Sequence, residues 1–564
     1  MDVLVFPSQT VSETVKDETE SEGIEEVSDL GWTFQDIYWG QCSVDVNPEL
    51  DEKFMSIQQM LDRESKFPPG EGNECFIPLN IQDTIISHDR VERELKAVLS
   101  GKGSENVKDL VEYICGTPNG GSAKRARKIF AILSLMDKQN LICDFYNERI
   151  YDGDLPLRKS GVGGKLKLIA KRRYKDFELK CCSGWSAPDK DIFFSYQWRM
   201  LSPFFGTRDG NPPFYNLESG VILPWTACSL LEDTIGGNSD VSRISIHDAH
   251  HGFGKNHNES FALKVLHSKN RRVFQTEFEA LKKVETHDHL VPVLAAFTHQ
   301  EKYYMIFPWA ENGNLSKLIN KTEVRNEAGM TYWVVSQCYG LATAIKHIHN
   351  ISIPIKSQPH ENEPKNTHGR TQAKVFGRHG DIKPSNVLLF QDDNLLNGRL
   401  KICDFGLTIF HSEKSKSMDH ALGGNPLSYS PPEMDGISRK FDIWCLGCLY
   451  LELLTWLILG PQGVENFNQS RFDEHGSDTN WSTDQFFKTM KGESGGSYAV
   501  IKKSVTEHIL RLESHQESIG YVKEFLKLIR NQMLVINHER RIDSDNLELK
   551  LRNILESYAL NTAG

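Results

Sequence analysis

The chain has 564 residues, of which 39% are hydrophobic and 10% aromatic, and its formal net charge at pH 7 is −11. This length exceeds what one hydrophobic core supports, so we expect two or three folded units, and the composition excludes a wholly disordered chain. The negative charge argues against a general nucleic-acid-binding protein.

The eleven cysteines do not form a recognisable disulfide framework. Cys445 and Cys448 form a single pair without a second pair nearby, so buried thiols explain them better than a zinc or redox site. The odd count, together with an acidic start that lacks an apolar leader, predicts an intracellular protein. The basic clusters 124–128 and 171–175 are better explained as charged helix faces or loops than as nuclear-import signals, so we expect the cytoplasm rather than the nucleus.

The first part of the chain carries no catalytic constellation. Residues 1–30 are rich in acidic and hydroxyl side chains and predict a disordered acidic tail. Residues 31–205 are expected to be mainly helical, because apolar residues recur at helical spacing from Val91 and again through 124–136. The role of this region is unknown.

The pattern of apolar and polar residues changes near residue 230, where strand-like segments begin. The sequence predicts a small β-rich lobe over 230–310 and a larger helical lobe over 311–556. Two polar stretches, 354–371 and 463–496, predict exposed insertions. The expected elements are strands at 241–247, 261–266, 290–297 and 303–307, with helices at 272–284 and 331–349.

The apolar run 444–459 is the strongest candidate for a membrane segment. It is short for a span, it contains Glu452, and it begins just after Asp442. A buried core helix explains it better, so no membrane span is expected.

Two motifs in the second half of the chain carry the chemistry. Residues 379–386 read His-Gly-Asp-Ile-Lys-Pro-Ser-Asn, and residues 404–406 read Asp-Phe-Gly. Phosphoryl transfer requires an acid that orients a hydroxyl, a cation beside the transferred phosphate, and oxygen ligands for Mg²⁺. A lone Asp-Phe-Gly tripeptide would be weak evidence, but both motifs in this order are specific.

The order of these motifs assigns a role to each polar residue. Asp381 is the candidate base, and Lys383 can neutralise charge on the γ-phosphate. Asn386 and Asp404 offer hard oxygen ligands to Mg²⁺. In the eukaryotic protein kinase family, which these two motifs resemble, the histidine at the position of His379 is an internal scaffold residue and not a base.

Residues 230–556 resemble a eukaryotic protein kinase catalytic domain. Three further segments carry the resemblance: 261–264 resembles Val-Ala-Ile-Lys, 430–433 resembles Ala-Pro-Glu, and 441–447 matches Asp-x-Trp-x-Leu-Gly. The resemblance implies an α+β, bilobal kinase-like fold that follows the helical N-terminal region, with ATP and Mg²⁺ as cofactors and an unknown protein substrate.

In the small lobe, the resemblance implies that Lys264 contacts the α- and β-phosphates of ATP. Glu277, in the helix that follows, is the acid expected to pair with Lys264. Glu279 is a rival, but it lies about 200° away around a helix, so only one of the two acids can point inward.

The resemblance also implies the residues that surround the nucleotide. Gly236, Gly237 and Val241 correspond to the glycine-rich loop and the strand after it, and Ala262 precedes Lys264. Phe307 corresponds to the gatekeeper, and Pro308, Trp309 and Ala310 correspond to the segment that joins the lobes.

The large lobe has implied structural pairs as well. Glu433 is expected to pair with an arginine near the end of the domain, either Arg541 or Arg540. Asp442 would brace the catalytic loop, and Phe405 would pack beneath the helix that carries Glu277.

Three positions depart from the family pattern. The glycine-rich loop keeps two adjacent glycines and places Asp240 near the phosphates; Gly380 stands where many kinases have an arginine; and Pro426 replaces a threonine that contacts Asp381. Two interpretations follow: a Ser/Thr protein kinase that depends on ATP and Mg²⁺, or a pseudokinase-like scaffold or signalling module with weak or no catalysis. The absence of an arginine-rich catalytic loop favours Ser/Thr over Tyr.

The segments 378–381 and 431–433 also resemble an expanded kinase-like group of filamentous fungi, and residues 129–133 and 152–157 resemble extensions found with it. This resemblance implies a two-part architecture and no particular substrate.

Overall fold

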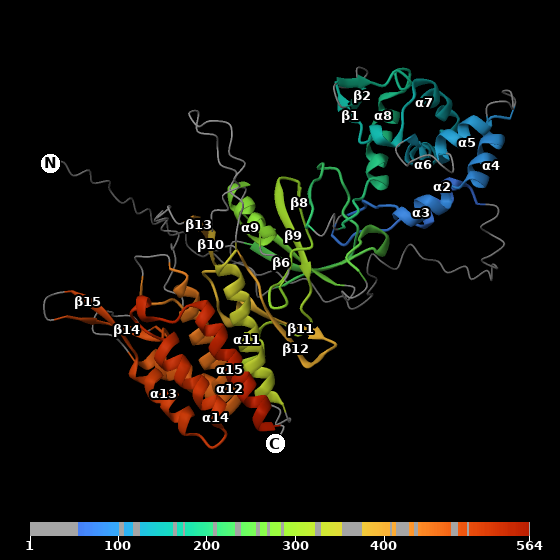
Figure 1. Ribbon diagram of the computed structural model, residues 1–564. Coiled ribbons are helices and arrows are strands. Elements are labelled where there is room, and N and C mark those ends of the chain that lie inside the picture. The colour runs from blue at the N-terminus through green and yellow to red at the C-terminus, as the bar shows by residue number, and fades with distance from the viewer. Residues whose placement is uncertain are drawn as a thin grey trace, which may run out of the picture. The chain divides into compact units, whose positions relative to one another are not determined.

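The computed structural model describes most of the chain from residue 55 onward (Figure 1). The predicted acidic tail, Gly236, Gly237, Pro426 and the segment 354–371 lie outside the described residues. The described residues are 55–70, 72–100, 107–116, 124–161, 166–172, 175–206, 211–231, 239–254, 260–267, 271–283, 287–321, 329–351, 375–405, 409–412, 428–433, 438–474, 483–492 and 496–562.

The N-terminal region is built of short helices around α6 (Arg127–Leu135), which is buried from Ile129 to Leu135. A three-stranded antiparallel sheet, β1-β2-β3, was not expected in this region. Its strands are short and rich in lysine, so their alternation is too weak to detect in the sequence. The other elements are α2 (Ile57–Arg63), α3 (Leu79–Ile85), α4 (His88–Val98), α5 (Val107–Cys115), α7 (Ile142–Glu148), α8 (Ala187–Tyr196), β1 (Arg158–Ser160), β2 (Lys167–Arg172) and β3 (Lys175–Glu178).

The small lobe contains a six-stranded sheet in the order β4-β8-β9-β7-β6-β5. All neighbouring strands are antiparallel except β4 and β8, which are parallel. The helix α9 (Arg271–Lys283) follows β7. The strands are β4 (Phe214–Asn216), β5 (Trp225–Leu230), β6 (Ser239–Ile246), β7 (Phe261–Leu266), β8 (Ala295–His299) and β9 (Lys302–Pro308).

Two boundaries of the small lobe differ from expectation. The sheet begins before residue 230, because β4 and β5 both belong to it. In β5 only Trp225 is buried, so no alternating pattern marks this strand in the sequence. The strand expected at 290–297 begins at Ala295 instead.

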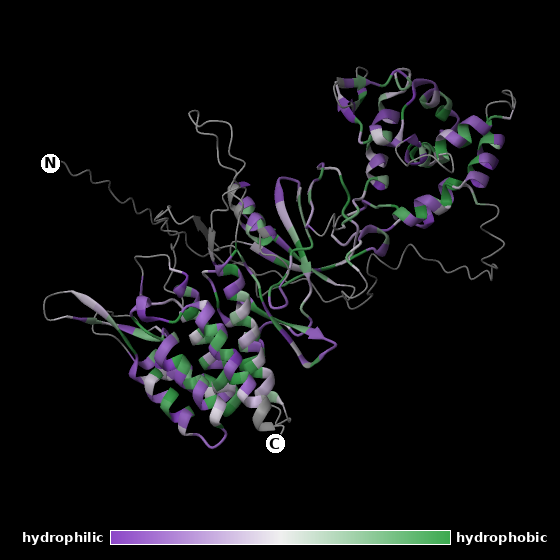
Figure 2. Cartoon of the chain, in the orientation of Figure 1, coloured by the Kyte–Doolittle hydropathy of each residue, from purple (hydrophilic) through white to green (hydrophobic). Residues whose placement is uncertain are grey.

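The large lobe is mainly helical, and α11 and α12 contribute more of its core than any other elements. Hydrophobic residues, green in Figure 2, gather where these helices lie. The hairpin β11–β12 and the antiparallel pair β10–β13, whose strands are far apart in the sequence, accompany the helices. The elements are α10 (Leu315–Lys321), α11 (Met330–His349), α12 (Lys440–Asp473), α13 (Lys503–Ser514), α14 (Gly520–Leu528), α15 (Ser544–Thr562), β10 (Val375–Arg378), β11 (Val387–Asp392), β12 (Leu395–Ile402) and β13 (Ile409–Ser412). The expected α+β, bilobal fold is confirmed.

The helix α12 is interrupted at Gly460, whose φ of 68° lies in the left-handed region that favours glycine. Pro461 then starts the second helical part, where its missing N–H removes no helical hydrogen bond. The expectation of an exposed insertion at 463–496 is wrong for its first part. The helix continues to Asp473 and buries Phe467 and Arg471, and the hairpin β14 (Phe487–Lys491) and β15 (Ser497–Ile501) follows.

Within the described part of the chain, α12 is the one helix whose length and composition would allow it to cross a membrane. Most of its apolar stretch is buried inside the large lobe, against residues of the common core. A core helix of this kind meets the same criteria.

Candidate active site

Lys264 on β7 brings together two acids from distant parts of the chain. Its Nζ lies 2.7 Å from Glu277 Oε1 on α9 and 2.9 Å from Asp404 Oδ1, just after β12. The Lys264 side chain is 12% exposed, that of Glu277 is 3% exposed, and that of Asp404 is 41% exposed. Burial opposes the charged form of Lys264, but the two carboxylates outweigh it and raise the pKa of the ammonium. Lys264 is therefore a fixed cation at the junction of the lobes.

The pairing expected between Lys264 and Glu277 is present. Glu279 instead lies on the outer side of α9, where its side chain is 53% exposed and 3.6 Å from Lys282 Nζ. Two positions along a helix differ by about 200°, so the helix can bury only one of these acids. The structure selects Glu277.

The catalytic-loop residues form a second network around Asp381. Lys383 Nζ donates to Asp381 Oδ2 at 2.8 Å, and Asn386 Nδ2 donates to the same oxygen at 2.8 Å. Asn386 Nδ2 also donates to the Asp381 backbone carbonyl at 2.9 Å. These bonds hold the carboxylate in one orientation. A general base needs such a fixed orientation, because it must lie within hydrogen-bonding distance of the hydroxyl whose proton it accepts.

Asp442 holds the backbone of this loop, as predicted. Its fully buried carboxylate accepts bonds from the N–H groups of His379 and Gly380 and from His349 Nε2, each at 2.9 Å. Burial alone would raise the pKa of Asp442, but these donors and the histidine charge lower it. Gly380 has a φ of 85°, so a residue without a side chain suits this turn.

Asp404 and Phe405 are fixed by the backbone and by packing. Asp404 has a φ of 67°, which is uncommon for a residue with a side chain and orients its carboxylate toward Lys264. The Phe405 ring is buried and lies edge-on to His379, with ring centroids 5.3 Å apart. His379 Nε2 in turn lies 3.1 Å from the Cys403 carbonyl. The histidine thus links the two motifs as scaffold.

Asn386 and Asp404 provide the oxygen donors that a divalent metal would use. The Asn386 amide nitrogen is already bonded to Asp381, which leaves its carbonyl oxygen as the other polar atom of the amide. No group of three or more His, Cys, Asp or Glu residues that could hold a metal occurs among the described residues. Two oxygen ligands suit Mg²⁺, which binds through one or two protein ligands together with substrate phosphates and water.

A small apolar cluster lies next to Asp404 and the inter-lobe segment. Val291, Ala310 and Phe390 form it, and Phe307, Leu388 and Cys403 pack against it. Burial raises the pKa of the Cys403 thiol to about 12, so the thiol stays neutral. The cluster includes two of the predicted nucleotide-binding residues, Phe307 and Ala310. Sequence reasoning missed Val291 and Phe390 as members of the site. The apolar run 387–390, directly after Asn386, was an available signal for Phe390.

Three of the other predicted nucleotide-binding residues that the structure describes lie on strands of the small lobe, and Trp309 follows β9. Val241 on β6 is opposite Lys264, and Ala262 on β7 is opposite Phe307. Pro308 ends β9, and the Trp309 ring lies 5.2 Å from the Arg243 guanidinium.

Asp240, which the sequence places near the phosphates, has a partner of its own. Its Oδ2 lies 2.7 Å from His267 Nε2, at the end of β7. When the histidine is protonated, the pair offsets the carboxylate charge that would otherwise repel a nucleotide.

The pair that anchors the large lobe involves Arg541 and not Arg540. Arg541 Nη1 and Nη2 donate to the two oxygens of Glu433 at 2.5 and 2.9 Å. The same guanidinium donates to the carbonyls of Val535 and Lys440. This bidentate bond ties the segment around Glu433 to the helical core.

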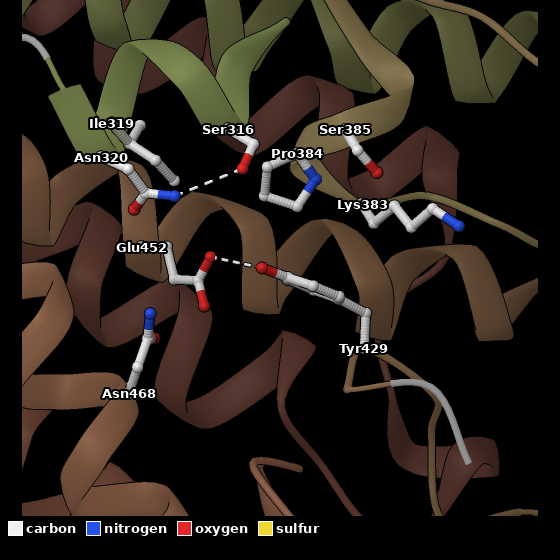
Figure 3. A pocket seen from close by; sticks show the side chains of 9 residues that line it. All are labelled: Ser316, Ile319, Asn320, Lys383, Pro384, Ser385, Tyr429, Glu452 and Asn468. Atoms are coloured by element: carbon white, nitrogen blue, oxygen red, sulfur yellow. Dashed lines mark hydrogen bonds between the residues drawn. The ribbon is translucent and has the colours of Figure 1, made fainter. Parts of the chain in front are cut away.

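A pocket of about 130 Å³ lies on the large lobe beside Lys383 (Figure 3). Glu452 is its one carboxylate, and both oxygens are engaged: Tyr429 Oη donates to Oε2 at 2.5 Å and Arg471 Nη2 donates to Oε1 at 2.9 Å. The pocket therefore offers mainly amides and hydroxyls rather than a free negative charge. Its lining residues are Ser316, Ile319, Asn320, Lys383, Pro384, Ser385, Tyr429, Glu452 and Asn468.

Comparison with known families matches two consecutive segments of the chain. Residues 236–354 match the family described as protein tyrosine and serine/threonine kinase, and residues 374–548 match the protein kinase domain. Together they span both lobes and all the site residues described above.

Curated relatives show the same similarity at low identity. Serine/threonine-protein kinase Aurora-1 of Arabidopsis thaliana is 28% identical over 208 residues, 36% of this chain and 58% of that protein. Salt tolerance receptor-like cytoplasmic kinase 1 of Oryza sativa subsp. japonica is 30% identical over 207 residues, 34% of this chain and 49% of that protein. Serine/threonine-protein kinase 33 of Bos taurus is 25% identical over 189 residues, 32% of this chain and 33% of that protein. Each match covers less than two thirds of the relative's length.

Proposed function

We propose that this chain, which belongs to the eukaryotic protein kinase superfamily, transfers the γ-phosphoryl group of ATP to Ser or Thr hydroxyls of a protein substrate. The observation that carries the proposal is the position of Lys264 Nζ, within 2.9 Å of both Glu277 and Asp404. A buried cation between these two acids joins the small lobe to the Asp-Phe-Gly segment, and phosphate binding requires this arrangement.

Each polar residue of the site then has one task. The substrate oxygen bonds to the γ-phosphorus, the bond from phosphorus to the β,γ-bridging oxygen breaks, and ADP leaves. Asp381 orients the hydroxyl and accepts its proton. Lys383, bonded to the same carboxylate, lies where it can neutralise charge on the transferred phosphoryl group, and Lys264 holds the α- and β-phosphates.

Asn386 and Asp404 would hold Mg²⁺. When bound, the ion would supply positive charge that offsets the charge developing on the transferred phosphoryl group. The bonds from Asn386 to Asp381 keep the metal ligand and the base in register, so the hydroxyl and the phosphate would meet in one geometry.

The apolar cluster around Phe307 and Leu388 would take the adenine ring. Backbone groups of Pro308, Trp309 and Ala310 would supply its polar contacts, although Pro308 offers only a carbonyl. The neutral Cys403 thiol closes the cluster beside Asp404.

Specificity for Ser and Thr rests on two supports. The relatives named serine/threonine-protein kinase are similar over the same region, and Lys383 follows Asp381 by two residues and contacts its carboxylate. An aliphatic hydroxyl is a poor nucleophile at its free pKa, and a base oriented by a cation suits it.

The test combines Mg-ATP binding with phosphoryl transfer. The full chain would be incubated with radiolabelled ATP and an arrayed library of Ser- and Thr-containing peptides, and Mg-ATP binding would be followed by thermal shift. We expect transfer that is lost in Asp404→Ala and reduced at least 100-fold in Asp381→Asn. Incorporation unchanged by Asp381→Asn would refute the proposal. Mg-ATP binding without transfer would support the scaffold or signalling alternative.

A further inference from the structure

Residues 211–217, which precede the part of the chain that matches the kinase families, contribute the edge strand β4 and an aromatic ring to the small lobe. β4 lies parallel to β8, with Phe214 opposite Ala296. Pro213 accepts a bond from the Ala296 N–H at 3.0 Å, and Leu217 donates to the Thr298 carbonyl at 2.9 Å. These bonds lie at the two ends of β4 and fix its register against β8.

The same segment is anchored at its start. Phe205 is fully buried among the aromatic rings of the sheet and lies 5.7 Å from the Trp225 ring and 5.4 Å from the Phe297 ring. Tyr215 packs edge-on against Phe205, with centroids 5.5 Å apart, and its hydroxyl lies 3.2 Å from the Gly206 carbonyl. Phe214 alternates with Tyr215 along the strand, so it faces the opposite side of the sheet.

On that opposite side, Phe214 meets α9. Its ring centroid lies 5.6 Å from that of Phe274 and 6.0 Å from that of Phe278. Both helix rings are buried, whereas Phe214 is 46% exposed and covers them from outside. Phe274 also stacks on Tyr303 of β9 at 4.6 Å. Phe214, on the edge strand β4 of this sheet, therefore packs against the aromatic face of α9.

These helix rings sit beside the acid of the site. Phe274, Glu277 and Phe278 are three and four positions apart, which places them on one face of α9. Glu277 reaches Lys264 Nζ at 2.7 Å, and a buried ion pair is stable only when its geometry is held closely. A small rotation or shift of α9 would part the two groups.

We propose that residues 203–206 and 211–217 position α9 for phosphoryl transfer, with Phe214 as the residue that keeps Glu277 within reach of Lys264. The proposal rests on the proposed kinase function and deepens it, because it gives the segment that precedes the family match a role in positioning a catalytic side chain. Phe214 touches neither nucleotide nor substrate, so it is a positioning residue.

The test uses the full chain and three variants. Phe214→Ala removes the ring, Phe214→Leu keeps an apolar side chain, and Tyr498→Ala removes a comparably exposed ring (53%) from the β15 strand as a control. Amide hydrogen exchange of α9 and the kinetics of phosphoryl transfer would be measured for each.

We expect faster exchange of α9 amides in Phe214→Ala and a kcat roughly three- to tenfold lower, from an aromatic contact worth up to about tenfold in an equilibrium. The KM for peptide should stay unchanged, because Asp381, the proposed base for the substrate hydroxyl, lies on the other lobe. Phe214→Leu should restore most of the rate, and Tyr498→Ala should change neither measurement.

Unchanged α9 exchange in Phe214→Ala would overturn the proposal, as would an equal loss of rate in Tyr498→Ala. The exchange measurement does not depend on activity. If the wild-type chain transfers no phosphate, the proposed function fails, and α9 exchange still decides whether Phe214 holds the helix.

Discussion

Ser428 and Asp484 are joined across 56 residues of sequence: the serine Oγ lies 2.7 Å from both carboxylate oxygens of the aspartate. Ser428 lies just before Glu433, near the end of the segment that starts at Asp404. Asp484 precedes Phe486, whose ring lies 6.2 Å from that of Tyr429. Residues 484–486, which follow α12, therefore contact the end of this segment at Ser428 and Tyr429.

This bond predicts the effect of removing its acceptor. Asp484→Ala should lower the free energy of unfolding by about 1–2 kcal/mol, because a hydroxyl bonded to a charged acceptor loses its partner. Urea denaturation would measure it. Ser428→Ala should have a similar effect, and the double variant should lose little more. Additive losses would show that the two residues do not interact. Ser428→Asp should destabilise more than Ser428→Ala, because it sets two carboxylates together.

Breaking the ion pair of Glu452 and Arg471 is expected to cause a larger loss of stability. Both side chains are nearly inaccessible to solvent, and the guanidinium also lies 4.3 Å from the Phe467 ring. Arg471→Met leaves a buried carboxylate without its cation and should lower the free energy of unfolding by about 3–5 kcal/mol. Adding Glu452→Gln should recover much of this loss.

The matched control is the exposed pair of Lys503 and Glu507, at 3.2 Å. Lys503→Ala should change the free energy of unfolding by less than about 1 kcal/mol. If Arg471→Met were no worse than this control, the buried pair would not contribute to stability.

Loss of the Asp442 charge is expected to lower the rate of phosphoryl transfer while the protein stays folded. Asp442→Asn keeps one oxygen acceptor but places an NH₂ group toward donors of the catalytic loop. We expect kcat to fall by up to about 100-fold as Asp381 moves, with a smaller change in the KM for ATP. Steady-state kinetics and circular dichroism together would check this, and an unchanged kcat would contradict the bracing role.

His250 predicts a dependence of stability on pH. It is buried, the Leu79 N–H donates to its Nε2 at 3.2 Å, and its Nδ1 lies 2.9 Å from the Pro203 carbonyl. Burial lowers its pKa to about 4, although the bond to Pro203 opposes this, and His247 and Lys128 lower the pKa further. The neutral form therefore belongs to the folded state.

Because the unfolded histidine titrates near pH 6.5, the unfolded state binds more protons between about pH 6.5 and 4. Stability contributed by neutral His250 is present above pH 6.5 and is lost as the pH falls toward 4, by up to about 3 kcal/mol. Urea denaturation at pH 7 and pH 5 should show a smaller difference for His250→Asn than for the wild type. An equal difference would exclude this histidine as a source.

Sequence reasoning was strongest where function sits in contiguous motifs. The order of Lys264, Asp381, Asn386 and Asp404 resembles that of the protein kinase family, and this resemblance implied the bilobal fold, while the chemistry of phosphoryl transfer gave each residue type its role. Arg541 and Arg540 remained alternatives as partners of Glu433, since both are close in sequence, and the structure selects Arg541 through a bidentate bond.

Elements without periodicity escaped prediction. β4 has three residues and β5 buries only its first, so neither shows an alternating pattern. The second part of α12 follows a glycine and a proline, which usually end a helix. β4 and β5 form because their backbones pair with β8 and β6, and the second part of α12 forms because it buries side chains in the core.

The sequence by itself determined the family, the catalytic residue types and their order along the chain. Only the tertiary structure decided which pairs meet: Glu277 rather than Glu279 at Lys264, Phe214 on α9, and Ser428 at Asp484. Motifs consist of residues close together in the sequence, whereas contacts such as the one between Lys264 and Asp404 join residues 140 positions apart. Which side chain lies within hydrogen-bonding or packing distance of another depends on how the whole chain folds back on itself, and no local pattern records that.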